Sequence, residues 1–440
     1  MKNIIEELLA EQYQSELPDL FRRPISIPSL PKNIRKALVF IGMRRVGKTF
    51  LMYQHMEELL KKGWDRKELL YLNFEDDRLS GFQAKDFQTI LDVYFEQFPE
   101  YSESDRVVFY FDEIQNIDGW EKFIRRLIDK EKMTILITGS SAKSLSRDIA
   151  TSLRGRSLSQ EVFPLGFSEY LAYRNVLYKK LISKKEEALI KKHLGDYLFR
   201  GGFPEILDLS VALFHQTIQS YVHATVFRDV IDRYDLSNPH IVKLFLIHCL
   251  QNIASPLSVT KIYKTLRSRG ESLSRNSLYS YLEYFEDAFL ICSVPIFDLS
   301  TRKRQVNPIK IYTIDTGIIS SYSLKPEMEH AARLENAVYI ELRKKKYETI
   351  CYYLTQSRKE VDFICQTPQG ALELYQVSID VSYPSTKERE VSALIEAAKE
   401  LNLKQGTIVT LDHEETMTQN DVILNFIPFW KWTLFSELSP

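Results

Sequence analysis

One short stretch, GMRRVGKTF at residues 42–50, constrains the fold of this chain more than any other. It fits the pattern G-x-x-x-x-G-K-[ST]. It follows the apolar run ALVFI and leads into FLMYQHMEELLKK, whose apolar residues recur at near-helical spacing. A loop of this pattern between a strand and a helix presents backbone N–H groups to phosphates. The sequence therefore predicts an α/β unit that opens with a phosphate-binding loop.

The residues of this loop have distinct expected roles. Gly42 and Gly47 permit the tight backbone path, Lys48 is expected to reach the β- and γ-phosphates, and the Thr49 hydroxyl is expected to bind Mg²⁺. The residues predicted to bind the nucleotide are Gly42, Arg44, Arg45, Val46, Gly47, Lys48, Thr49 and Phe50.

Apolar runs that follow the loop predict further strands of one sheet, namely LLYLNFE, VVFYFDE, TILITGS and the weaker LSQEVFPL. Runs that are apolar throughout indicate strands covered on both faces, as in a parallel sheet. Ligands of such sheets bind at the carboxyl ends of the strands. We therefore expect Asp112 to hold Mg²⁺ and Glu113 to orient the attacking water. Ser140, at the end of the next strand, either takes part in that chemistry or only completes a turn.

Charged residues near these strands allow two interpretations. Arg154 and Arg156, in LRGR, can stabilise charge on a γ-phosphate in the same chain or in a neighbouring subunit, or can be solvated surface residues. Glu75 and Asp76, which end LLYLNFED, are interpreted as an acidic surface at the sheet edge rather than as a second site.

In this order, the blocks GMRRVGKTFL, YLNFEDDRL, FYFDEIQNIDGWEKFIRRL, ILITGSS and LRGR resemble the AAA-type ATPases of bacteria and archaea that carry an uncharacterised C-terminal region. The resemblance implies ATP as the nucleotide, with Mg²⁺. It also implies a sheet in which the strand TILITGS lies between the loop strand and the acid strand. It extends more weakly over nearly the whole chain, and it implies no particular cellular process.

The sequence pattern of residues 241–325 predicts a small helical module followed by strands. Ser258 and Ser274 can cap two successive helices, a pattern that resembles a winged helix-turn-helix. Arg302, Lys303 and Arg304 would then lie in or near the wing. Duplex DNA is one expected partner of such a module. Because the second helix offers Arg275 as its one basic contact residue, a packing role inside the protein is the favoured interpretation.

The C-terminal region resembles the restriction-endonuclease-like core. The matching positions are Glu335 or Glu341, then Asp362, then Gln376 and Ser378. An active metal site needs anionic oxygen ligands, whereas Gln376 is neutral and Ser378 stands where a lysine is wanted. We therefore expect a nuclease-like fold that does not cut nucleic acid.

The composition limits which partners, metal sites and locations the sequence predicts. A net charge of −1 over 440 residues gives no general attraction to nucleic acid or membranes. The four cysteines, Cys249, Cys292, Cys351 and Cys365, show neither metal-binding nor disulfide spacing. No apolar run reaches transmembrane length. We expect a cytoplasmic protein without a membrane partner.

The predicted fold class is α/β: a P-loop AAA-type ATPase with a parallel sheet, a helical lid, a winged-helix module and a C-terminal α/β nuclease-like domain. The predicted segments are an N-terminal helix and connector at 1–35, the ATPase core at 36–165, the helical lid at 166–240, the winged-helix-like module at 241–325 and the inactive nuclease-like domain at 326–440.

The predicted function is an ATP-binding protein that hydrolyses ATP to drive or gate a conformational switch. One alternative is a DNA-binding regulator or defence component in which ATP only controls assembly. A metal-dependent nuclease is a second alternative. Whether the partner is duplex DNA, a second copy of the chain or another protein stays open.

Overall fold

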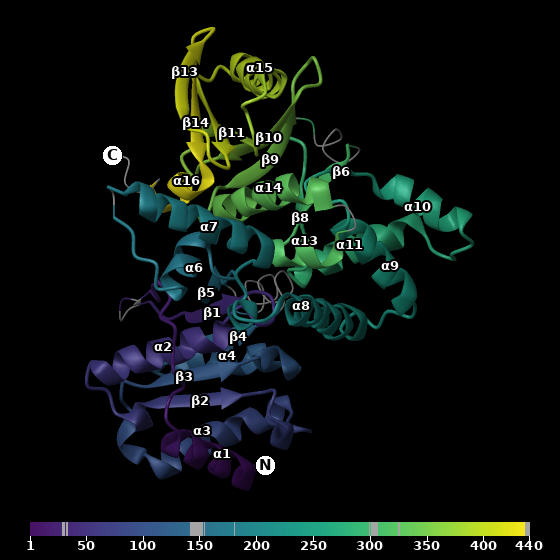
Figure 1. Ribbon diagram of the computed structural model, residues 1–440. Coiled ribbons are helices and arrows are strands. Elements are labelled where there is room, and N and C mark those ends of the chain that lie inside the picture. Colours follow the sequence, from purple (N-terminus) through teal and green to yellow (C-terminus); the bar gives the residue numbers. More distant parts are fainter. Residues whose placement is uncertain are drawn as a thin grey trace. The chain divides into compact units, whose positions relative to one another are not determined.

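The computed structural model divides the chain into two compact units, Met1–Phe163 and Pro164–Pro440, which are described separately (Figure 1). The residues described are 1–28, 31, 34–140, 153, 155–179, 181–298, 300, 307–323 and 326–435.

The first unit is a parallel sheet flanked by helices. Its strands are β1 (Ala37–Ile41), β2 (Leu69–Asn73), β3 (Val108–Asp112), β4 (Thr134–Gly139) and β5 (Ser157–Glu161). Its α-helices are α1 (Lys2–Gln14), α2 (Lys48–Lys61), α3 (Phe87–Gln97) and α4 (Trp120–Lys130). The strand order is β2-β3-β4-β1-β5, with every neighbouring pair parallel. Strand β4 thus lies between β1 and β3, as the resemblance implied.

Burial explains why these segments form strands. Every residue of β1 and β3 is buried, and five of the six residues of β4 are. These are the runs that are apolar throughout in the sequence. Because all five strands are parallel, their carboxyl ends share one edge of the sheet, which places the ends of β1, β3 and β4 together.

The second unit begins with helices. They are α6 (Phe167–Tyr173), α7 (Lys184–Arg200), α8 (Val211–Thr225) and α9 (Pro239–Leu250). A capping box at Ser183 starts α7, and the Ser210 side chain caps α8. Helix α7 ends at Gly201, whose φ of 78° suits glycine.

A small three-stranded antiparallel sheet with two helices follows. The strands are β6 (Pro256–Leu257), β7 (Cys292–Val294) and β8 (Ile309–Tyr312), in the order β6-β8-β7, and the helices are α10 (Val259–Ser268) and α11 (Arg275–Asp287). Ser258 and Ser274 cap the two helices, as predicted. The winged-helix assignment stays a prediction, and Arg302, Lys303 and Arg304 lie outside the described residues.

A six-stranded mixed sheet forms the C-terminal part. Its order is β13-β14-β12-β11-β10-β9, with β11, β12 and β14 parallel to one another. The strands are β9 (Thr349–Leu354), β10 (Glu360–Gln366), β11 (Leu372–Ser378), β12 (Gln405–Thr410), β13 (Glu415–Gln419) and β14 (Val422–Pro428). The helices are α13 (Thr316–Tyr322), α14 (Pro326–Lys344), α15 (Pro384–Glu400) and α16 (Phe429–Phe435). Buried side chains of α15 pack with those of the sheet into one hydrophobic core.

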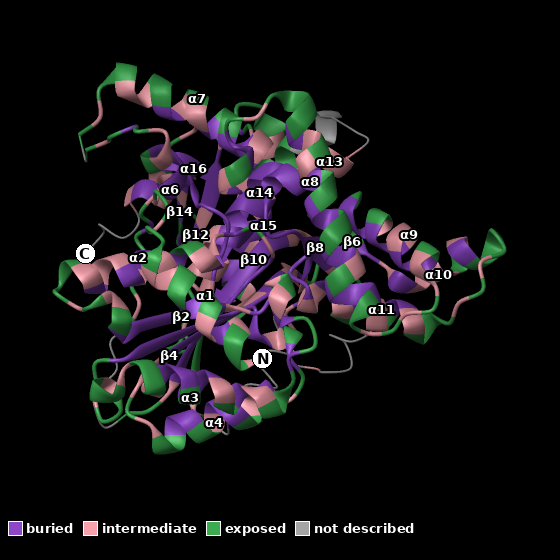
Figure 2. Ribbon diagram, turned by 90° about the horizontal axis from the view of Figure 1, so that it is seen from below, coloured by how far each residue is buried: buried purple, intermediate pink, exposed green. Residues whose placement is uncertain are grey.

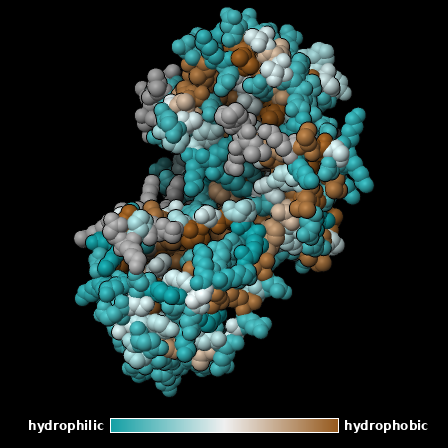
Figure 3. Space-filling view, turned by 90° about the vertical axis from the view of Figure 1, so that its left-hand side faces the viewer, coloured by the Kyte–Doolittle hydropathy of each residue, from teal (hydrophilic) through white to brown (hydrophobic). Residues whose placement is uncertain are grey.

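Buried residues follow the strands, and exposed residues cover the outer faces of the helices (Figure 2). The face seen in Figure 3 is mainly hydrophilic in both units, with hydrophobic side chains in scattered groups. Among the described residues, no helix combines the length and the apolar character needed to span a bilayer.

Candidate nucleotide-binding site

The phosphate-binding loop joins β1 to α2 and depends on its two glycines. Gly47 precedes the first residue of α2 with a φ of 94°. A Cβ on Gly42 would lie 2.4 Å from the backbone oxygen of Val162, so a side chain there would collide with the segment after β5. The sequence places glycine where the backbone requires it.

Lys48 is the central cation of the loop and is only 4% exposed. Its Nζ donates to the backbone oxygens of Gly42 at 3.0 Å and Met43 at 3.1 Å. The same nitrogen lies 3.5 Å from Glu113 Oε1. The ammonium group therefore lies over its own loop and beside the acid at the end of β3.

Asp112 ends β3 and is held by hydroxyl groups from three other strands or helices. Its Oδ2 accepts from Thr49 Oγ1 at 2.7 Å and from the Tyr71 hydroxyl at 2.8 Å, and its Oδ1 accepts from Thr138 Oγ1. Burial and the nearby charge of Glu113 raise the pKa of Asp112, while the three hydroxyl groups oppose that rise. A buried carboxylate is thereby fixed beside the loop threonine.

Glu113 follows directly, with a left-handed φ of 51°. Its backbone N–H donates to Thr138 Oγ1 at 2.9 Å, and its carboxylate accepts from Gln115 Nε2 at 2.5 Å. Although burial acts against ionisation, the Lys48 charge and the Gln115 bond hold the pKa of Glu113 below its usual value. Gln115 Nε2 also lies 3.4 Å from Ser140 Oγ, which links the acid to the end of β4.

The remaining loop residues lie around this centre. Arg44 Nη1 bonds Glu75 Oε1 at 2.7 Å, so Glu75 pairs with the loop rather than forming a separate acidic site. Arg45 adopts a left-handed φ of 68°, Val46 is buried, and Phe50 is 50% exposed.

The sequence predicted two arginines, Arg154 and Arg156, near the γ-phosphate, and the structure describes the position of Arg156. Arg156 forms an ion pair with Asp129 at 2.8 Å, and its backbone oxygen accepts from Ala37 N at 2.9 Å. It therefore sits at the amino ends of β1 and β5, whereas the phosphate-binding loop follows the carboxyl end of β1. This position contradicts the expectation that Arg156 contacts a γ-phosphate bound to the same chain. Arg154 lies outside the described residues.

Three residues of the site carried no signal in the sequence. Arg23, from the connector before β1, is 7% exposed, and its Nη1 donates to the Val46 backbone oxygen at 3.0 Å. Gln54 of α2 exchanges hydrogen bonds with the Arg23 backbone at 2.9 and 3.0 Å. Tyr71 of β2 reaches Asp112 across the sheet edge. Each contact joins segments that are far apart in the chain, so no local sequence pattern predicts it.

In the C-terminal part, a lysine occupies the centre of the predicted nuclease-like acids. Lys310 of β8 is 1% exposed, and its Nζ lies 3.0 Å from Glu335 Oε1, 2.7 Å from Glu360 Oε1 and 2.9 Å from Asp362 Oδ1. The Tyr312 hydroxyl also donates to Glu335 at 2.7 Å. The three acids thus share one internal cation.

The other predicted nuclease positions serve packing contacts. Gln376 Oε1 accepts from Asp362 N at 3.2 Å, and its Nε2 donates to Glu390 at 2.6 Å. Glu341 lies 3.3 Å from Lys344, away from the Lys310 cluster. Within the described part of the chain, no group of three or more His, Cys, Asp or Glu side chains is arranged to hold a metal ion.

Comparisons with known proteins identify the family. Residues 34–171 match the family described as AAA domain, and residues 191–328 and 331–432 match two domains of unknown function, DUF8612 and DUF4143. The uncharacterized protein MJ1544 of Methanocaldococcus jannaschii is 32% identical over 98% of this chain and 96% of its own length. The chain belongs to this family of AAA-domain proteins.

An uncharacterized protein of Haemophilus influenzae is also similar, with 30% identity over 78% of this chain and 82% of its own length. The expectation of a prokaryotic AAA family with an uncharacterised C-terminal region is confirmed.

Solved structures also match this chain, among them two archaeal proteins. The Walker-type ATPase PABY2304 of Pyrococcus abyssi is 15% identical, with a TM-score of 0.41 over 66% of this chain and 91% of that chain. The ORC2 protein of Aeropyrum pernix is 11% identical, with a TM-score of 0.36 over 78% of this chain and 94% of that chain. Likenesses of this size carry no functional argument.

Proposed function

We propose that the N-terminal unit binds ATP with Mg²⁺ and hydrolyses it, and that the bound state of the nucleotide acts as a conformational switch. The observation that carries this proposal is the 2.7 Å bond between Thr49, which follows the phosphate-binding loop, and Asp112, which ends the acid strand β3. The AAA-domain match over residues 34–171 supports it.

The residues present fit a hard divalent cation and a polyphosphate. Thr49 and Asp112 offer the hydroxyl and carboxylate oxygens that Mg²⁺ prefers. When bound, Mg²⁺ supplies neutralising charge at the phosphate oxygens. The loop N–H groups and the Lys48 ammonium bind and orient the phosphates.

Glu113 is proposed as the residue that orients the attacking water and accepts its proton. Its lowered pKa keeps it a carboxylate at neutral pH, as a general base requires. Gln115 holds one oxygen of that carboxylate and also reaches Ser140, so a change at the end of β4 can alter the orientation of Glu113. This link is the proposed first element of the switch.

Phosphate release with and without Mg²⁺, together with ATP binding, tests the proposal. We expect Lys48→Ala to lose ATP binding. Glu113→Gln should keep ATP binding and lose turnover by a factor on the order of 10² or more. Glu103→Gln is the matched control, because Glu103 is a surface acid with 85% of its side chain exposed. Wild-type turnover retained in both site variants would refute the assignment.

A second candidate function, binding of duplex DNA, is favoured by one specific observation on α10. Lys261, Lys264 and Arg267 recur every third residue on this helix, and all are exposed. Across the described residues, none of the three forms an ion pair with a carboxylate. This basic row provides phosphate contacts that the α11 face alone lacks.

A gel shift on duplex DNA over a range of salt concentrations tests this candidate. We expect Lys261→Glu, Lys264→Glu and Arg267→Glu together to abolish the shift and to flatten its salt dependence. The matched control reverses Lys399 and Lys404, two exposed lysines of the C-terminal part. If the wild-type protein does not shift duplex DNA even at low salt, DNA binding is refuted as a function of this region.

A further inference from the structure

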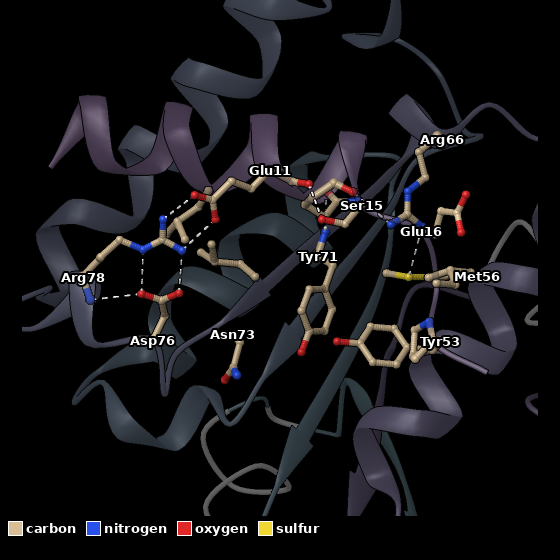
Figure 4. A pocket seen from close by; sticks show the side chains of 15 residues that line it. Glu11, Ser15, Glu16, Tyr53, Met56, Arg66, Tyr71, Asn73, Asp76 and Arg78 are labelled. Atoms are coloured by element: carbon tan, nitrogen blue, oxygen red, sulfur yellow. Dashed lines mark hydrogen bonds and ion pairs between the residues drawn. The ribbon is translucent and has the colours of Figure 1, made fainter. Parts of the chain in front are cut away.

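A pocket of about 220 Å³ lies at the edge of the parallel sheet in the first unit (Figure 4). Residues of α1, of the loop after it, of α2 and of β2 line it, among them Gln12, Tyr53, Arg66, Tyr71 and Asn73. It adjoins the carboxyl end of β2, on the side of the sheet edge where α/β proteins place their ligands. The proposed ATP chemistry gives this pocket no role.

Tyr71 belongs both to this pocket and to the nucleotide-binding site. Its ring faces the ring of Tyr53 at a centroid distance of 5.2 Å. Its hydroxyl donates to Asp112 Oδ2 at 2.8 Å, and the same oxygen accepts from Thr49 Oγ1 at 2.7 Å. One carboxylate oxygen is therefore held from the edge strand and from the phosphate-binding loop at once.

In the contact between Tyr71 and Asp112, the tyrosine hydroxyl is the hydrogen-bond donor, because a carboxylate offers only acceptor oxygens. Together with the Thr49 bond, this hydrogen bond fixes the position of one oxygen of the Asp112 carboxylate. An anionic, fixed carboxylate is the form that serves a divalent cation.

We propose that Tyr71 is a positioning residue for Mg²⁺ binding, acting through Asp112. This inference rests on the proposed function, because it concerns the same metal ligand. Partners that orient a metal ligand commonly contribute 10- to 100-fold to metal affinity. Tyr71→Phe should therefore raise the Mg²⁺ concentration for half-maximal ATP hydrolysis by about 10-fold or more. At saturating Mg²⁺, the KM for ATP should stay near the wild-type value.

The matched control is Tyr94→Phe. Tyr94, on α3, also donates one hydroxyl hydrogen bond, to the Lys67 backbone oxygen at 2.9 Å, but it has no contact with Asp112. Both variants lose one hydroxyl group and one hydrogen bond inside the same unit. A purely structural role of Tyr71 would give both variants similar losses in melting temperature and the same Mg²⁺ dependence.

The experiment titrates Mg²⁺ against ATP turnover and against the binding of a fluorescent ATP analogue, in wild type and both variants. A shift in Mg²⁺ dependence confined to Tyr71→Phe supports the inference. A Tyr71→Phe titration that overlays the wild type overturns it and leaves the proposed function intact. If the wild type shows neither nucleotide binding nor turnover, both the proposed function and this inference are refuted.

Discussion

Replacing Lys310 with methionine offers a sharp test of the reasoning about the C-terminal part. The lysine stem and the methionine side chain are similar in length, so the change mainly removes the ammonium group. That group lies within 3.0 Å of carboxylate oxygens of Glu335, Glu360 and Asp362. Without it, the acids face one another without a cation.

The expected magnitude follows from burial. Lys310 is 1% exposed, and the side chains of Glu335 and Asp362 are 13% and 9% exposed. Breaking such a buried pair by removing one partner costs about 3–5 kcal/mol of unfolding free energy. At about 2–4 °C per kcal/mol, the melting temperature should fall by at least about 6 °C near pH 8.

The loss should depend on pH in a defined direction. Burial, together with the charge of Asp362, raises the pKa of Glu335 to about 8 from its ordinary 4.5. An acid whose pKa is raised on folding disfavours the folded state increasingly as pH rises between those two values. That part of the pH dependence is shared with the wild type. In Lys310→Met the acids also lose the cation that favours their charged forms, so ionising them inside the fold costs more than in the wild type. The penalty relative to wild type should therefore be smaller near pH 5 and larger near pH 8.

Thermal unfolding of the full chain between pH 5 and 8 measures this effect. Lys359→Met is the matched control, because Lys359 is 41% exposed and pairs with Glu396 at 3.1 Å. An exposed pair contributes at most about 1 kcal/mol. If Lys310→Met and Lys359→Met melt alike, or if the Lys310→Met penalty is the same at pH 5 and pH 8, the account of an acid cluster that shares one cation is wrong.

Further outcomes concern the glycine after α7 and the surroundings of the phosphate-binding loop. Gly201→Ala should lower the melting temperature, because the φ of Gly201 is 78° and the new Cβ would lie 1.7 Å from Asp315 Oδ1. Gly195→Ala should raise the melting temperature, because Gly195 lies within α7 and a Cβ there meets open space. Equal melting temperatures for these two variants would contradict the packing argument. Gln115→Ala should lower kcat about 10-fold or more with little change in KM, in steady-state assays, because the carboxylate it holds loses its orientation. A change in KM alone would count against that role. Arg23→Ala should weaken ATP binding in equilibrium titrations, since a backbone oxygen of the phosphate-binding loop loses its donor. An unchanged Kd would mean that Arg23 only packs.

Much of the first unit could be predicted because its signals are local. The apolar runs that end in Ile41, Asp112 and Gly139 become buried parallel strands, and the strand of Gly139 lies between the other two. Parallel strands bring their carboxyl ends to one edge. For that reason Thr49 and Asp112, far apart in the chain, could be expected to meet, and they lie 2.7 Å apart.

The C-terminal part was predicted less completely. Either Glu335 or Glu341 was expected beside Asp362. The structure brings Glu335 and Asp362 around one ammonium group and leaves Glu341 beside Lys344. No local pattern distinguishes Lys310 from the other lysines of the chain, because its partners follow it by 25 and 52 residues, on a helix and on a strand of the larger sheet domain.

The sequence by itself determined the phosphate-binding loop, its following helix and the acids at the end of β3. These features depend on glycine at particular backbone angles and on apolar runs of adjacent residues. Only the tertiary structure decided that Tyr71 reaches Asp112, that Lys310 pairs with the acids of the C-terminal part and that Arg156 sits at the far ends of the strands. Those outcomes are set by strand order and register, which bring together residues that no short pattern connects.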